Sequence, residues 1–120
     1  MKEIPFKKSL KINILGTPYT IIHKKESEDV KLREIAGYCD YSSKIIVWRE
    51  ENADEFTLND LGFVYKRVIR HEIIHAFMYE SGIWCNSFNV ANWATNEEMT
   101  DWFAIQSPKI YKVFDKLNIL

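Results

Sequence analysis

The stretch His71-Glu72-Ile73-Ile74-His75 lies in the second half of residues 58–80, a segment that we predict to be one long helix. Positions four apart share a helix face, so His71 and His75 point the same way and Glu72 lies beside them. Two imidazoles one turn apart can hold a zinc ion at about 2.1 Å, while the carboxylate reaches a water on the open side of the metal. The spacing therefore predicts a metal site on a central helix.

The ordinary explanation of the same spacing is a surface helix that carries two solvated histidines and a glutamate. The surrounding residues 68–77 are mostly apolar, however, so the polar side chains would be partly buried. Buried polar groups need partners, and a metal ion with hydrogen bonds around its ligands supplies them. We therefore favour one Zn²⁺ per chain.

Length and composition favour a folded globular protein. The 120 residues fit a single domain, 1–120, and the 47% hydrophobic and 14% aromatic content argues against disorder. A net charge of −1 gives no electrostatic basis for binding nucleic acid or an anionic membrane. No apolar run approaches the twenty or so residues of a membrane-spanning helix, and residues 1–8 lack the apolar core of a signal peptide. The two cysteines are too few for a disulfide framework. We expect a cytoplasmic protein that binds neither nucleic acid nor membrane.

The first half of the chain has the patterns of strands. Leu10, Ile12 and Ile14 alternate with polar residues, which predicts a half-buried strand. Gly16-Thr17-Pro18 predicts a turn, and residues 19–23 the returning strand. Residues 35–40 and 44–48 flank a turn at 41–43 and predict a second hairpin.

The second half has the patterns of helices. Thr57 or Asn59 is placed to cap the helix 58–80, and Ser81-Gly82 is placed to end it. A second helix is predicted from about residue 96 to 105, and Ser107-Pro108 to cap and start a third, C-terminal helix. Strands followed by helices indicate an α+β fold. We expect a mostly antiparallel sheet of about four strands packed on the helix of His71 and His75, then a Glu-bearing helix and the C-terminal helix.

A catalytic zinc site needs a third protein ligand. Glu97 and Glu98 are the candidates, although a glutamate in a first helical turn is favoured there by the helix dipole and usually faces solvent. Asp101 lies one turn after Glu97 on the same face, where it could accept the free ring N–H of His71 or His75. Glu98 instead shares its face with apolar residues, so we favour Glu97.

These residues together resemble a known family. His71-Glu72-Ile73-Ile74-His75, followed by Asn96-Glu97-Glu98-Met99-Thr100-Asp101, is similar to the two motifs of the gluzincin metallopeptidases, whose second motif is a Glu followed four residues later by Asp or Asn. Phe103-Ala104 is also similar to the corresponding helix of the ImmA/IrrE-like peptidases of phages and mobile elements. The short chain looks like a minigluzincin, which implies a small zincin-like domain, and the resemblance covers roughly residues 35–106.

The resemblance implies a zinc peptidase, phage- or mobile-element-encoded, that acts on a peptide or protein substrate. His71, His75 and Glu97 would be the zinc ligands, with Asp101 supporting them through a hydrogen bond. Glu72 would be the general base that takes a proton from the zinc-bound water. The family binds an extended peptide along an edge strand, for which residues 44–48 are the candidate.

The chain also departs from the large gluzincins, whose C-terminal domain supplies a His or Tyr that stabilises the oxyanion. Tyr79, one turn beyond His75, is a candidate for this role, although an aromatic anchor for the helix end explains it as well. Tyr38 and Tyr41 are further candidates. The alternative function is a catalytically weak or inactive zinc-binding module that binds a host or regulatory protein.

The remaining chemically active side chains have ordinary explanations. We expect His23, in a strand, to be structural, and Cys39 and Cys85 to be small buried thiols. Trp84, Trp93 and Trp102 are expected to pack in the core, with a pocket lining as the alternative. A latent form, in which the N-terminal tail or residues 117–120 cover the cleft, is also left open.

Overall fold

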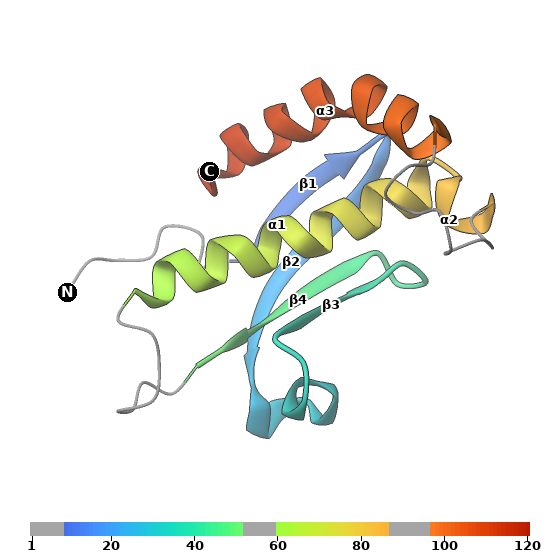
Figure 1. Cartoon of the computed structure of the whole chain (residues 1–120). Helices are drawn as coiled ribbons and strands as arrows, with labels where there is room; N and C mark the ends of the chain where they lie inside the picture. The colour runs from blue at the N-terminus through green and yellow to red at the C-terminus, as the bar shows by residue number, and fades with distance from the viewer. Residues whose placement is uncertain (1–8, 52–59, 87–96) are drawn as a thin grey trace.

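A computed structural model describes residues 9–51, 60–86 and 97–120 of the chain. Four strands come first and helices follow, which confirms the α+β class (Figure 1). The strands are β1 (Leu10–Ile14), β2 (Thr17–Lys25), β3 (Gly37–Asp40) and β4 (Ile45–Glu50), and the helices are α1 (Leu61–Glu80), α2 (Ile83–Asn86) and α3 (Glu97–Leu117). Two short 3-10 turns, η2 (Glu26–Glu28) and η3 (Val30–Arg33), occupy the charged segment between β2 and β3.

The strand order in the sheet is β1-β2-β4-β3. Strands β1 and β2, like β3 and β4, pair antiparallel, whereas β2 and β4 pair parallel, so the sheet is mixed and mostly antiparallel. The prediction that residues 44–48 form an edge strand is wrong, because β4 pairs on both sides and the edge strands of the described sheet are β1 and β3. The physical reason is the apolar run Ile46, Val47 and Trp48, which is buried on both faces of the sheet and so favours an inner position.

The first hairpin turns one residue earlier than the predicted 16–18. Leu15 and Gly16 have φ of 52° and 95° and form the connection by themselves. Two positive φ values match the twist of the flanking strands, which is why short hairpins use them. Strand β2 therefore begins at Thr17, and Pro18 lies within it opposite Asn13.

Helix α1 crosses the sheet and carries the central motif (Figure 1). Asp60 caps it by accepting the N–H of Phe63 at 3.0 Å, whereas the predicted caps Thr57 and Asn59 lie outside the described residues. Ser81 is the last cap residue, and Gly82 follows with φ of 88°, as expected of a residue that ends a helix in the left-handed conformation.

Helix α3 is one continuous helix of 21 residues with Pro108 inside it. The expectation of two helices divided at Ser107-Pro108 is therefore wrong. A proline removes one hydrogen bond and usually kinks a helix rather than fixing its end, and α3 changes direction part way along (Figure 1). Burial of Trp102 before the proline and of Ile110 and Phe114 after it attaches both halves to one core.

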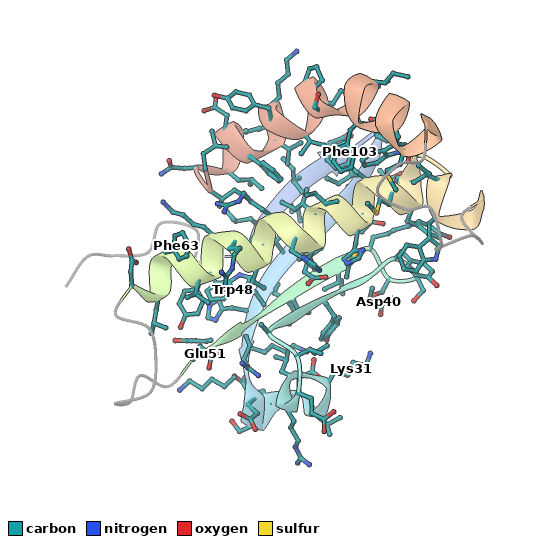
Figure 2. All side chains as sticks on the ribbon, viewed as in Figure 1. Lys31, Asp40, Trp48, Glu51, Phe63 and Phe103 are labelled. Carbon is teal, nitrogen blue, oxygen red and sulfur yellow. The ribbon has the colours of Figure 1, made fainter. Side chains whose placement is uncertain are left out.

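The core lies between the sheet and the helices α1 and α3. Trp48 of β4, labelled in Figure 2, is 1% exposed and packs beneath α1 with Ile69 and Ile73. The chain end joins this core, because Ile119 is fully buried and its carbonyl oxygen accepts a hydrogen bond from Arg70 at 2.7 Å. Residues 117–120 therefore pack away from the cleft described below, which rules out this form of the latent arrangement; the N-terminal tail, residues 1–8, lies outside the described residues. None of the described helices is both long and apolar enough to cross a membrane.

Candidate metal centre

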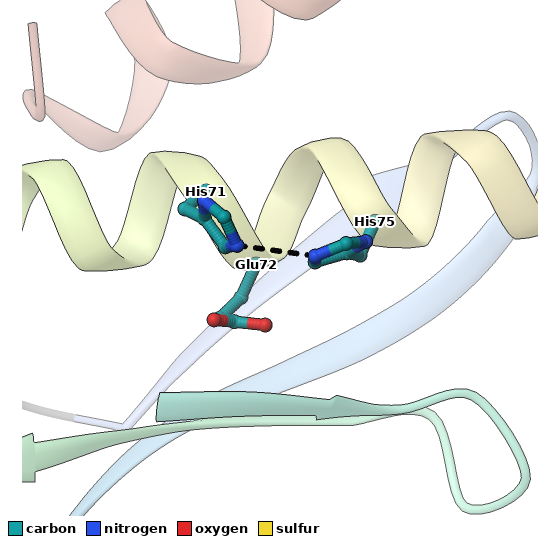
Figure 3. A group of neighbouring side chains, drawn as sticks. All are labelled: His71, Glu72 and His75. Carbon is teal, nitrogen blue, oxygen red and sulfur yellow. Dashed lines mark hydrogen bonds between the residues drawn. The ribbon is translucent and has the colours of Figure 1, made fainter. Parts of the chain in front are cut away.

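His71 and His75 bring their Nε2 atoms to 3.1 Å on one face of α1 (Figure 3). The ligand atoms of these two residues and of Glu72 all lie within 4.8 Å of one another. Two ligands of a tetrahedral zinc at about 2.1 Å are themselves about 3.4 Å apart, so the imidazole separation fits a shared ion. The group can hold a metal ion, which confirms the geometry predicted from the spacing. The same separation also allows one ring N–H to donate to the other ring.

The charged states of the group follow from burial. Glu72 is 7% exposed, and this burial raises the pKa of its carboxyl to about 7. Burial, and then the neighbouring charge of His71, lowers the pKa of His75. His75 is therefore held neutral, which is the state of an imidazole that binds a metal.

The other ring nitrogen of His75 supports the same conclusion. Its Nδ1 is buried and has no hydrogen-bond partner among the described residues. Buried polar atoms are nearly always paired, and a metal-binding imidazole commonly donates its second N–H to a carboxylate. The donor set and this orphaned atom both fit a metal ligand.

Local packing places the group at the rim of the core. Ile69 and Ile73 are fully buried on the core face of α1, whereas His71 is exposed. Glu72 points from α1 toward the strands (Figure 3). Strand β3 comes close to it at Gly37, where an added Cβ would lie only 3.5 Å from Cγ of Glu72.

Two open clefts meet at the group. The first, of about 270 Å³, is lined by Gly37, Tyr38, Cys39, Tyr41, His71, Glu72, His75 and Trp84. The second, of about 350 Å³, is lined by Ile35, Ala36, Gly37, Arg67, Val68, His71 and Glu72. Because they share Gly37, His71 and Glu72, the clefts form one depression between α1 and the edge strand β3, which we call the α1–β3 groove.

The predicted third ligand begins α3. Glu97 is the first residue of that helix and Asp101 follows one turn later, so their backbone positions share a helix face as predicted. Trp102 Nε1 donates to Ser81 Oγ at 2.7 Å, which holds this part of α3 against the end of α1. The side chains of Glu97, Glu98 and Asp101 lie outside the described structure, and their roles stay predictions.

The tyrosines near the group are engaged in packing. Tyr79 stacks on Tyr41 with 4.1 Å between ring centroids and 17° between planes. The Tyr38 hydroxyl donates to Asp29, and burial together with this bond raises the pKa of Tyr38 to about 12. Tyr38 and Tyr41 line the groove, whereas Tyr79 lies behind Tyr41. The oxyanion role of Tyr79 stays a prediction, and its stacking supports the anchoring role.

Trp84 lines the site instead of packing in the core, as we had expected it to do. It is 47% exposed, lines the groove and has its ring centroid 5.9 Å from that of His75. Trp102 packs in the core as expected, and Trp93 lies outside the described residues. Arg67 also lines the groove, although the sequence analysis did not include it among the site residues. It lies one turn before His71 on the same helix face, so the four-residue interval could have predicted its place beside the site.

His23 has the structural role that we expected, whereas Cys39 is not a fully buried thiol but lines the groove. His23 Nδ1 lies 3.1 Å from a carboxylate oxygen of Glu50. Cys39 is half-buried, and burial raises the pKa of its thiol to about 12, so the thiol stays protonated. A protonated thiol is a poor metal ligand, which agrees with packing as its role. The side chain of Cys85 lies outside the described structure.

Comparisons with protein-family models, with curated proteins and with solved structures give no match. The geometry of His71, Glu72 and His75 and the groove around them is therefore the basis of the functional proposal. That geometry defines a candidate metal centre, with the identity of the metal left to chemistry and experiment.

Proposed function

We propose that this protein is a minimal gluzincin-like zinc peptidase that hydrolyses peptide bonds with metal-activated water. The observation that carries the proposal is the pair of Nε2 atoms 3.1 Å apart, with the buried carboxylate of Glu72 beside them in an open groove. An imidazole pair with an adjacent carboxylate on one helix is the arrangement that zinc hydrolases use.

In this proposal His71, His75 and Glu97 hold the zinc, and Asp101 orients an imidazole. Zinc, when bound, lowers the pKa of a water ligand toward 7 and polarises a carbonyl oxygen. Glu72 supplies the proton transfer. A carboxylate whose pKa has been raised toward 7 by burial can accept a proton near neutral pH and return it to the leaving amine.

The edge strand offers a way to hold the substrate. Strand β3 pairs with β4 on one side, and no described strand pairs with its other side. An extended peptide can add to such an edge through main-chain hydrogen bonds. Because Gly37 of β3 lies beside Glu72, a peptide bound along β3 would pass the proposed general base.

A catalytically weak zinc-binding module that docks a host or regulatory protein is the second candidate. The stacking of Tyr79 on Tyr41 favours it in one respect, because it engages in packing the tyrosine that was named to stabilise the oxyanion. This candidate keeps the fold and the groove but needs no proton transfer by Glu72.

The test compares the zinc-loaded wild type with Glu72→Gln. Elemental analysis should find one zinc per chain in both proteins. The variants His71→Ala and His75→Ala should contain no stoichiometric zinc. Hydrolysis of an unfolded protein substrate should fall at least about 100-fold in Glu72→Gln, because the amide cannot act as a base. Equal hydrolysis by the two proteins would contradict the peptidase proposal. Zinc binding without hydrolysis by the wild type would support the binding module.

A further inference from the structure

The two ends of the α1–β3 groove differ in chemistry. At one end lie Tyr41 and Trp84, which are 40% and 47% exposed and have ring centroids 6.2 Å apart. Tyr41 also stacks on Tyr79 at 4.1 Å, and Trp84 stands edge-on to His75. We call Tyr41 and Trp84, with Tyr79 stacked behind Tyr41, the aromatic end of the groove. It offers an apolar surface directly beside the proposed metal ligand.

This aromatic end is held in place from behind. Lys44 Nζ lies 4.9 Å from the centre of the Tyr79 ring and 2.9 Å from a carboxylate oxygen of Glu80. Glu80 in turn accepts hydrogen bonds from Tyr19 at 2.8 Å and from Thr17 at 2.9 Å. Aromatic rings that are already ordered lose little conformational freedom when a ligand covers them, which favours binding.

The opposite end of the groove carries a positive charge. Arg67 lines it beside Ile35 and Val68, and its guanidinium lies 5.6 Å from the centre of the Phe63 ring. No described carboxylate forms an ion pair with Arg67. An acidic group is therefore the complementary partner at this end.

The spacing of the two ends fits a short extended peptide. Arg67, His71, His75 and Tyr79 recur every fourth residue along α1, and each interval advances about 6 Å along the helix axis. An extended chain advances about 3.3 Å per residue, so each interval corresponds to about two peptide residues. The groove from Arg67 to the aromatic end then spans about five residues, with the imidazole pair near the middle.

We infer that the groove selects extended peptides that carry a large apolar or aromatic side chain at the aromatic end and an acidic side chain about five residues away beside Arg67. The inference rests on the proposed function only in taking the bound chain to lie along β3. Apolar contact supplies the first preference and charge complementarity the second. The two preferred side chains lie on either side, along the chain, of the peptide bond that faces Glu72.

The test uses fluorescein-labelled peptides of Gly, Ala and Ser that carry one Phe and one Glu four or six residues apart, in both orders, because side chains on one face of an extended chain recur at every second residue. Binding to the zinc-loaded Glu72→Gln protein is measured by fluorescence anisotropy, which requires no hydrolysis. One order should bind about tenfold more tightly than the same peptide with Phe→Ala, and about threefold more tightly than with Glu→Lys. Equal binding of all these peptides would overturn the inference.

Two variants distinguish contact from general damage to the fold. Trp84→Ala should remove most of the preference for Phe and leave the ratio of Glu to Lys binding intact. Arg67→Glu should invert that ratio, so that the Lys peptide binds more tightly, which a misfolded protein cannot do. Lys66→Glu, the matched control, makes the same charge change at a residue that does not line the groove and should not invert it. Failure of Arg67→Glu to invert the ratio would overturn the acidic preference.

The failure of the inference and that of the proposed function give different results. Hydrolysis by the wild type without any preference for Phe or Glu would overturn the inference alone. A clear binding preference without hydrolysis would contradict the peptidase proposal and keep the selectivity of the groove. No binding of any peptide would overturn the inference whatever the hydrolysis result.

Discussion

Gly37 of β3 lies directly against Val68 of α1, beside Glu72, and the missing side chain at position 37 is what lets the two elements approach. A Cβ at Gly37 would lie 3.5 Å from Cγ of Glu72, 2.7 Å from Cγ1 of Val68 and 2.8 Å from the carbonyl oxygen of Val47. The contacts with Val68 and Val47 are overlaps, whereas the distance to Glu72 is an ordinary contact, so the edge strand packs this closely on α1 only because residue 37 is glycine.

Gly37→Ala should therefore destabilise the protein. The added methyl group overlaps backbone as well as a side chain, so β3 must shift, at a cost of about 1–3 kcal/mol in the free energy of unfolding. Urea denaturation measures this cost. We also expect weaker peptide binding, because the shifted strand widens the groove. An unchanged midpoint together with unchanged binding would contradict the described approach of β3 to α1.

Burial of Glu72 predicts a pH dependence of stability in the metal-free protein. Its pKa is about 7 in the folded protein and 4.5 for the ordinary side chain, so the folded state binds more protons between these values. Stability should then fall as the pH rises from about 4.5 to 7. After allowance for screening by water in the open cleft, we expect a loss of about 2 kcal/mol.

The measurement is urea denaturation at pH 4.5 and pH 7.5 in the presence of a chelator, for the wild type and Glu72→Gln. The variant has no carboxyl group at this position, so it should lack the part of the pH dependence that Glu72 contributes. Parallel pH profiles for the two proteins would show that Glu72 titrates normally and is not desolvated.

Glu80→Gln should loosen the end of α1. Burial acts to raise the pKa of the Glu80 carboxyl. The carboxylate also accepts hydrogen bonds from Lys44, Tyr19 and Thr17, and these bonds hold its pKa below the ordinary value. The stabilisation is present above the ordinary pKa and is lost as the pH falls through the lowered value. We expect Glu80→Gln to cost about 2 kcal/mol at pH 7 by urea denaturation.

Glu26→Gln is the matched control, because Glu26 is exposed and lies away from α1. It should change the free energy of unfolding by less than about 0.5 kcal/mol. The difference between Glu80→Gln and the wild type should shrink as the pH falls below the ordinary pKa of 4.5 and through the lowered pKa of Glu80. A difference that stays constant throughout the acid titration would contradict the assignment to an ionised carboxylate.

The third metal ligand can be identified by metal content. Glu97→Ala should lose the zinc that the wild type retains after dialysis, and Glu98→Ala should keep it, because Glu97 lies four residues before Asp101 whereas Glu98 lies four residues before the buried Trp102. Elemental analysis gives the stoichiometry, and circular dichroism checks that both variants are folded. Retention of zinc by Glu97→Ala and its loss in Glu98→Ala would assign the ligand to Glu98.

The features predicted correctly from the sequence are those with short-range causes. Alternation of apolar residues predicted β1, the turn at 41–43 predicted the β3–β4 hairpin, and the four-residue interval predicted that His71 and His75 share a face. Each depends on backbone geometry within a few residues, so the order of residues alone carries it.

Tertiary structure decided the rest. Parallel pairing of β2 with β4 made β3 the edge strand, and packing of both halves of α3 on one core carried the helix through Pro108. The burial that raises the pKa of Glu72, and the meeting of Trp84 with Tyr41 beside His75, bring together residues from separate elements. Such contacts depend on how apolar surfaces are removed from water over the whole chain, and no local pattern records which surfaces will meet.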